Sequence, residues 1–158
     1  MNIAQLLENA ARSYPDNAAV CLGPKRILSY RQLCVNAQAV GRGLVERFGL
    51  AAGDRVAVIM TNTPEYLEVL FGIWWAGLVA VPINARLHPR EVHYILESSA
   101  ARVCFTNADV EPSIRTLGGT LPDLKGMLSV QQAEYRSLLQ CGALERAHRS
   151  SSDPAWLF

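Results

Sequence analysis

The sequence predicts an α/β fold with an open, mostly parallel, Rossmann-like sheet that carries helices on both faces. Two observations lead to this prediction. Near-continuous apolar runs at 55–60, 79–83 and 102–106 are typical of strands that are buried on both faces of a parallel sheet. Amphipathic segments separate these runs, and the alternation of apolar strands with helices produces right-handed βαβ units.

The N-terminal part is predicted to form a helix and a short β-hairpin. Asn2 is a suitable N-cap for a helix with apolar residues at helical spacing, and this helix must end before Pro15. Residues 17–22 and 26–28 have strand character and flank the turn Gly23-Pro24-Lys25. The two short strands therefore pair as a hairpin ahead of the main sheet.

A capping box predicts where the second helix starts. The Ser29 hydroxyl can accept a hydrogen bond from the Gln32 amide, while the Gln32 side chain reaches back to residue 29. Gly49 suits the C-terminal end of this helix. Its apolar face consists of Leu33, Ala37, Val40 and Leu44.

Thr63 and Pro64 mark the start of the third helix, with Thr63 as the expected N-cap and Pro64 at the first helical position. Pro89 begins a fourth helix. The pattern then weakens, because residues 131–149 are polar and have no clear period. The remaining expectations are a helix at 110–117, a strand at 124–130 and the beginning of a strand at 155–158.

Length and charge exclude several classes of protein. The 158 residues correspond to about one domain, and half of them are hydrophobic. The 15 Lys and Arg residues nearly balance the 14 Asp and Glu residues, so nucleic acid is not an expected partner. The longest apolar run, 69–81, is shorter than the roughly 20 residues of a membrane span. No membrane span is therefore expected.

The N-terminus and the cysteines predict a cytoplasmic protein. Glu8 falls where a secretory signal would be apolar, and the first basic residue is Arg12. The four cysteines form no C-x-x-C pair, so they are expected to be small buried hydrophobes in a reducing compartment. Cys104 lies within an apolar run, where burial raises the pKa of a thiol.

Familiar catalytic patterns are absent from the chain. No stretch matches the phosphate-binding G-x-x-x-x-G-K-[ST] loop or the G-x-S-x-G turn of hydrolases. His88 and His93 are five residues apart, whereas two zinc ligands on one helix face are four apart. The residues by themselves therefore assign no catalytic, no cofactor-binding and no metal-binding side chain.

Trp74 and Trp75 have two interpretations. The pair is either a ligand-facing or lipid-facing surface, or a structural pair with one ring in the core and the other on the flank of the same helix. The helical spacing of the neighbouring apolar residues favours the structural interpretation.

Several stretches, in this order, resemble the core motifs of the adenylate-forming, AMP-binding enzymes. The residues that carry the resemblance are Leu28-Ser29-Tyr30-Arg31-Gln32-Leu33, Gly53-Asp54-Arg55-Val56-Ala57, Asn62-Thr63-Pro64-Glu65-Tyr66, Trp75-Ala76-Gly77-Leu78-Val79-Ala80-Val81-Pro82-Ile83-Asn84 and Asp153-Pro154-Ala155-Trp156-Leu157-Phe158. Gln32 and Trp75 depart from the usual Glu and Lys. The matched positions are expected to be structural: Leu28, Ser29, Tyr30, Leu33, Gly53, Asp54, Gly77, Pro82, Asn84 and Arg86.

The resemblance implies a ligase that uses ATP, Mg²⁺ and CoA. The stretch Asn84-Ala85-Arg86-Leu87-His88-Pro89-Arg90-Glu91 looks like that of fatty-acid and related acyl-CoA synthetases. Such enzymes join a carboxylic acid to AMP and then transfer the acyl group to CoA. The helix at 64–76 is expected to line part of the acyl tunnel, with Trp74 and Trp75 as candidate tunnel residues. Two alternatives remain: an enzyme that passes an amino or aryl acid to a carrier protein, and a non-catalytic Rossmann-like interaction module.

The resemblance also implies that residues 1–158 are a single, truncated N-terminal subdomain of an AMP-binding domain. In the family, a Thr/Ser/Gly-rich phosphate loop follows the stretch that resembles 153–158, and a mobile C-terminal domain carries a catalytic lysine. Neither is present in these residues. The chain alone is therefore expected to be inactive and to bind none of the cofactors. It is also expected to form a homo-oligomer through the apolar surface that truncation exposes.

Overall fold

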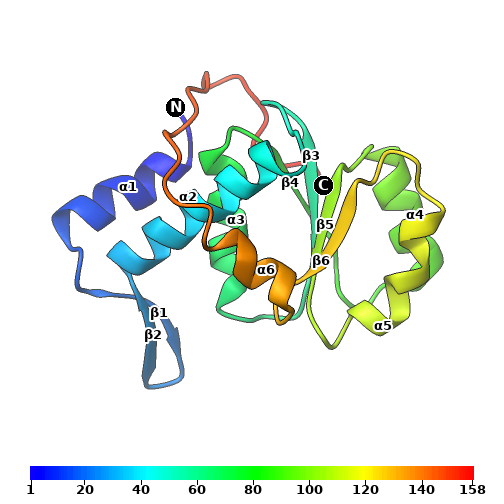
Figure 1. Cartoon of the computed structure of the whole chain (residues 1–158), viewed down its shortest axis with the longest axis horizontal. Helices are drawn as coiled ribbons and strands as arrows, with labels where there is room; N and C mark the ends of the chain where they lie inside the picture. Colours follow the sequence, from blue (N-terminus) through cyan, green and yellow to red (C-terminus); the bar gives the residue numbers. More distant parts are fainter.

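A parallel sheet of four strands, in the order β4-β3-β5-β6, forms the centre of the protein (Figure 1). The computed structural model describes all residues, 1–158. A separate antiparallel hairpin, β1-β2, precedes the sheet in sequence. The elements are α1 (Ala4–Ser13), β1 (Ala18–Leu22), β2 (Lys25–Ser29), α2 (Tyr30–Glu46), β3 (Arg55–Ile59), α3 (Glu65–Trp75), β4 (Val79–Pro82), α4 (Pro89–Ser98), β5 (Val103–Thr106), α5 (Glu111–Ile114), the 3₁₀ helix η1 (Arg115–Gly119), β6 (Gly126–Ser129) and α6 (Ala133–Leu138).

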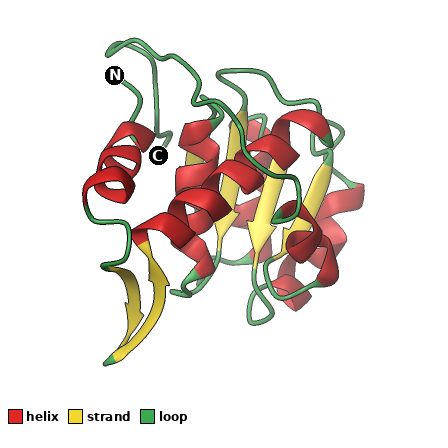
Figure 2. Cartoon of the chain, turned by 60° about the vertical axis from the view of Figure 1, so that its left-hand side comes forward, coloured by secondary structure: helices red, strands yellow, loops and turns green.

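Helices cover both faces of the sheet, as predicted (Figure 2). Along β3, Val56 and Val58 pack into a core with α1, α2, α3 and α6. Ala57 and Ile59 face the other way, into a smaller core with α4 and α5. Because successive side chains of a strand point to opposite faces, a strand that is covered on both sides must be apolar throughout. This explains the continuous apolar runs in the sequence.

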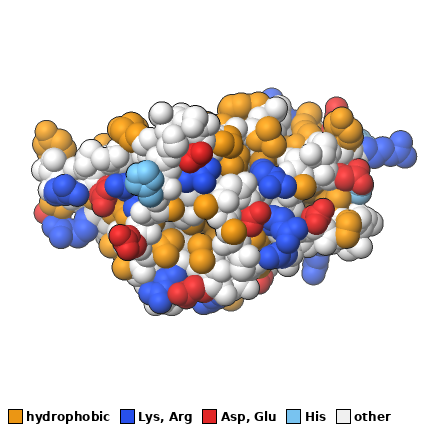
Figure 3. All heavy atoms as spheres, turned by 90° about the horizontal axis from the view of Figure 1, so that it is seen from above, with side chains coloured by type: hydrophobic (Ala, Val, Ile, Leu, Met, Phe, Trp, Pro, Cys, Tyr) orange, Lys and Arg blue, Asp and Glu red, His pale blue; other side chains and the backbone are white.

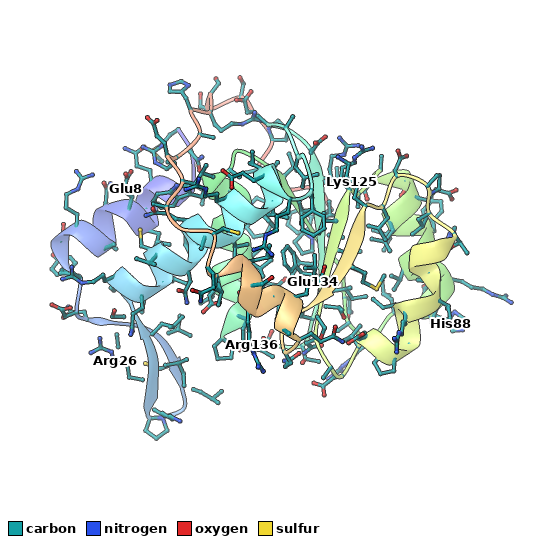
Figure 4. All side chains as sticks on the ribbon, in the orientation of Figure 1. Glu8, Arg26, His88, Lys125, Glu134 and Arg136 are labelled. Carbon is teal, nitrogen blue, oxygen red and sulfur yellow. The ribbon has the colours of Figure 1, made fainter.

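Capping contacts fix the starts of two helices. The Ser29 hydroxyl accepts from the Gln32 amide at 3.2 Å, and the Gln32 side chain accepts from the Ser29 amide at 2.9 Å, which confirms the predicted capping box of α2. His88 and Glu91 form a second capping box at the start of α4. Figure 4 shows His88 at that end of α4. The imidazole therefore serves as a local acceptor for the Arg90 amide.

Two predictions about single positions were wrong. Thr63 does not cap α3: its hydroxyl is buried without a hydrogen-bond partner, and Pro64 is the residue that flanks the helix. The cysteines are not uniformly buried, since Cys21 is exposed on the hairpin and Cys141 is half-buried, whereas Cys34 and Cys104 lie in the core. The hairpin stands apart from the main sheet, so its turn-side residues have little to pack against (Figure 2).

The stretch 131–149 contains a helix that the sequence pattern did not reveal. α6 follows β6 and buries Tyr135 and Leu138. Tyr135 contacts Phe105 of β5 in an edge-to-face arrangement with ring centroids 6.2 Å apart. The helix has only six residues, of which two are buried, so it is too short to show a helical period.

The C-terminal residues lie along the outer edge of β4. Trp156 forms a parallel bridge with Ala80. The Ala80 amide donates to the Ala155 carbonyl at 3.0 Å, and the Leu157 amide donates to the Ala80 carbonyl at 2.9 Å. The segment 153–158 thus begins a further parallel strand beside β4, where the sequence predicted the beginning of a strand.

On the side seen in Figure 3, basic and acidic side chains are interspersed, so neither charge forms a large patch there. No helix of the protein has the length and apolar character that crossing a bilayer requires.

Candidate functional site

The carboxyl ends of the parallel strands form the candidate functional edge of the protein. From β3 the chain passes through α3 to β4 on one side, whereas β5 and β6 lie on the other side of β3. The connections therefore diverge between β3 and β5. Open parallel sheets bind their ligands outside the carboxyl ends of the strands, at such a divergence.

A hydrogen-bonded polar group occupies this divergence. Asn107, which follows β5 and is 1% exposed, donates its side-chain amide to the Thr61 hydroxyl. Thr61 follows β3 and in turn donates to the Asp109 carboxylate at 3.0 Å. The Asn107 side-chain oxygen has no partner. The three side chains thus form a hydrogen-bonded chain that runs from Asn107 through Thr61 to Asp109.

Asn84 and Arg86 lie at the same edge, directly after β4. The Asn84 side-chain oxygen accepts from the Arg86 amide at 2.9 Å, which holds the turn between β4 and α4. Both side chains are exposed. The guanidinium of Arg86 forms no ion pair in the chain. Because the segment 153–158 runs parallel to β4, its carboxyl end points towards this same edge.

The other matched motif positions build the fold. At the amino edge of the sheet, the Gly53 amide donates to the Gly77 carbonyl at 3.0 Å, and both glycines have positive φ, +90° and +73°. The Asp54 carboxylate accepts from the Ala51 amide at 2.9 Å. Leu28, Ser29, Tyr30 and Leu33 surround the start of α2, and Pro82 ends β4. The structure thus separates these positions between the two ends of the sheet.

Trp74 and Trp75 are both buried, with 6% and 3% of their surface exposed. The indole N–H of Trp74 donates to the Ala155 carbonyl at 3.0 Å, and that of Trp75 donates to the Leu144 carbonyl at 2.8 Å. Both partners belong to the segment that returns over α3 after α6. The role of the two residues in an acyl tunnel stays a prediction.

A buried acid is the feature that sequence reasoning missed. Glu68 of α3 is 5% exposed and accepts hydrogen bonds from Tyr135 at 2.5 Å and from Asn36 at 2.9 Å. Burial raises the pKa of Glu68, although the two hydrogen bonds oppose this effect. Burial beside this carboxylate also raises the pKa of Tyr135. The signal in the sequence was an acidic residue on an apolar helix face. The hydrogen-bond partners of this residue could not be identified in the sequence, because they come from α2 and α6.

A cavity of about 220 Å³ lies beside this acid and is lined in part by Glu65, Gln131 and Arg136. Figure 4 shows Arg136 and Glu134 on α6 at the end of the sheet opposite Lys125. Glu68 and Tyr135 both line this cavity and are hydrogen-bonded to each other. We interpret the pair as the contact that holds α6 against α3.

The residues present do not fit the phosphates of ATP or a magnesium ion. No group of three or more His, Cys, Asp or Glu side chains is placed to hold a metal. No glycine-rich turn follows a strand at the carboxyl edge, so no cradle of backbone amides for phosphate is formed. The chain therefore shows no preformed cradle for either group.

Comparison with known proteins decides the family. The family described as AMP-binding enzyme matches residues 7–156. The chain belongs to the AMP-binding enzyme family. Its resemblance to adenylate-forming enzymes is thereby confirmed, and so is the predicted fold class.

Individual relatives are ligases. The chain is 37% identical over 100 residues to the long-chain-fatty-acid–CoA ligase of Haemophilus influenzae, which covers 63% of this chain and 18% of that enzyme. Among solved structures, the anthranilate CoA ligase AuaEII in complex with anthranoyl-AMP matches 99% of this chain and 30% of its own, with 27% identity and a TM-score of 0.90.

A second solved structure is the N-terminal domain of FACL13 from Mycobacterium tuberculosis, with 26% identity and a TM-score of 0.87. The match covers 99% of this chain and 41% of that domain. The chain spans about a fifth of the length of the curated relatives it matches.

Proposed function

We propose that the chain is the N-terminal subdomain of an ATP-dependent acid–CoA ligase that works through an acyl-adenylate. The family match across residues 7–156 carries this proposal. In the first half-reaction, a carboxylate oxygen attacks the α-phosphorus of ATP and pyrophosphate leaves. In the second, the CoA thiol attacks the acyl carbonyl and AMP leaves. We also propose a cytoplasmic location, where both ATP and CoA are available.

The course of the C-terminal segment supports a structural role in the first half-reaction. The segment 153–158 resembles the lead-in to the family's phosphate loop and runs parallel to β4. A loop that continued this segment would emerge at the carboxyl edge, beside Asn84 and Arg86. Residues 1–158 would then serve as the scaffold for the phosphate site, while the phosphate-binding amides lie beyond residue 158.

A fatty acid is the first candidate substrate. The similarity to the long-chain-fatty-acid–CoA ligase and the stretch 84–91 both favour it. An aryl acid is the second candidate, because the anthranilate CoA ligase AuaEII matches nearly the whole chain at a TM-score of 0.90. The two substrate classes differ in the acid only, so the adenylation chemistry is the same.

ATP–pyrophosphate exchange tests the proposal. Two proteins are compared: residues 1–158 alone, and the same chain extended to the end of its reading frame. Each is assayed with Mg²⁺ and either palmitate or anthranilate. We expect no exchange from residues 1–158 and acid-dependent exchange from the extended chain. Exchange by residues 1–158 would contradict the scaffold role.

The same extended chain tests which molecule accepts the acyl group, and it tests the two alternative functions. Formation of acyl-CoA from the preferred acid supports the ligase assignment. Transfer to a carrier protein with no acyl-CoA formed would favour the other branch of the family. A reading frame that ends at residue 158, together with the absence of any exchange, would favour the non-catalytic interaction module.

A further inference from the structure

Trp74, near the C-terminal end of α3, donates its indole hydrogen bond to one carbonyl of the segment 153–158. The Ala155 carbonyl accepts from the Ala80 amide at 3.0 Å and from the Trp74 indole at 3.0 Å. One of the two donors is thus a backbone amide of the neighbouring strand β4, and the other is a side chain of the helix α3. The second donor comes from an element that is already fixed in the core, because Trp74 is 6% exposed.

Aromatic contacts strengthen this attachment. The rings of Trp74 and Trp156 meet nearly edge to face, with centroids 4.6 Å apart and planes at 70°. Trp156 in turn stacks on Phe158, at 5.8 Å and 18°. Such pairs contribute beyond the area that they bury. The segment is therefore held by a hydrogen bond and by a ring contact from the same residue of α3.

Asn2 ties the same end of α3 to the returning chain. Its side-chain amide donates to the Trp74 carbonyl at 2.6 Å and to the Ala147 carbonyl at 2.9 Å. Its side-chain oxygen accepts from the Ala4 amide at 2.9 Å, although Ile3 and not the predicted Asn2 is the residue that flanks α1. Asn2 is 4% exposed. An Arg149–Asp153 ion pair at 3.3 Å joins the two ends of the following turn. These contacts fix the position of the chain just before the segment 153–158.

We propose that Trp74 is a positioning residue that sets the register of the segment 153–158 against β4, and hence the entry to the phosphate loop. The second part of this statement rests on the proposed function. A strand can slip by two residues and keep its faces. Such a slip would move Ala155 away from the indole N–H and Trp156 away from the ring of Trp74. The helix thus opposes a slip that backbone pairing alone would allow.

Amide hydrogen exchange in residues 1–158 tests the register role without any assay of activity. Trp74→Phe removes the N–H but keeps an aromatic ring. Trp75→Phe is the matched control, because it also removes an indole hydrogen bond, but one to Leu144, outside the segment. We expect Trp74→Phe to speed exchange of the Ala80 and Leu157 amides about fivefold, the effect of one hydrogen bond. The control should change them less than about twofold.

A second variant guards against general loss of the fold. Benzothienylalanine at position 74 keeps the shape of the double ring but replaces the N–H with sulfur. The same rise in exchange at Ala80 and Leu157 would support the register role. If both position-74 variants left the two amides unchanged, the proposal would be overturned.

The extended chain tests the phosphate-loop role. There we expect Trp74→Phe to raise the KM for ATP in pyrophosphate exchange about fivefold, with a smaller change in the KM for the acid. Tyr14→Phe, at an exposed aromatic residue that follows α1, should leave the KM for ATP within about twofold. Equal KM values for ATP in both variants would overturn the phosphate-loop role. If the wild-type extended chain showed no exchange, the proposed function would fail, and the amide measurements would still decide the register role.

Discussion

Glu68 brings a carboxylate into the core, where Tyr135 and Asn36 each donate a hydrogen bond to it. Its pKa is raised by burial above the ordinary value of 4.5. A carboxyl group whose pKa is higher in the folded state favours folding most when protonated. Its contribution to stability is therefore fully present below its unfolded pKa and is lost as the pH rises through its folded pKa.

Glu68→Gln should remove this part of the pH dependence. The amide can still accept from Asn36 and can donate to the Tyr135 hydroxyl, which works as donor or acceptor. We expect the unfolding free energy of the wild type to fall relative to the variant as the pH rises from about 4.5. Urea unfolding at a series of pH values measures this difference. The exposed Glu97→Gln is the control, and a similar pH trend in both variants would refute the prediction.

The four thiols should differ in reactivity according to their burial. Cys104 is fully buried, and burial raises its pKa to about 12. Cys21 is exposed on the hairpin. We therefore expect iodoacetamide to label Cys21 in the native protein and Cys104 only in denaturant, as read by peptide mass spectrometry. Cys21→Ser should abolish the fast adduct. Labelling of native Cys104 at the rate of Cys21 would contradict the packing.

At the scale of elements, the sequence predicted those helix features that depend on residues close together in the chain. The capping box of α2 depends on two side chains three residues apart, so it was visible in the sequence. α6 was missed because Tyr135 is buried by contacts with β5 and α3, which lie far away in the sequence. Thr63 is a residue type that often caps helices, but in the structure Pro64 occupies the N-cap position of α3. The Thr63 hydroxyl has no hydrogen-bond partner.

The crossing of α2 and α3 depends on a glycine. A Cβ atom on Gly72 would lie 2.7 Å from Val40 Cγ1 and 3.0 Å from the Ala37 carbonyl oxygen. Gly72→Ala should therefore destabilise the protein by about 1–3 kcal/mol, although alanine is the better helix former. Urea unfolding measures the loss. Gly118→Ala is the control, since nothing lies within 4 Å of its added Cβ atom. Equal stabilities for the two variants would show that the helices can separate freely.

At the scale of the whole molecule, the apolar C-terminal residues favour self-association. Phe158 is 95% exposed and Leu157 is 42% exposed, at the edge of the sheet beyond β4. An exposed strand edge with apolar side chains is a template for pairing with another chain. We expect the mass of residues 1–158 in light scattering to rise with concentration. Replacing Leu157 and Phe158 by Ser should reduce the rise. A constant monomer mass for the unchanged chain would disprove the expectation.

The sequence by itself determined the alternation of apolar strands with helices and the two-sided burial of the sheet, but not α6. These features follow from local periodicity, and the motif residues carried the family resemblance. Only the tertiary structure decided that Glu68 meets Tyr135, that Asn107 meets Thr61, and that Trp74 holds Ala155. Each of these contacts joins residues that lie far apart in the sequence. Such partners are chosen by how helices pack on a sheet, and this packing leaves no periodic trace in the chain.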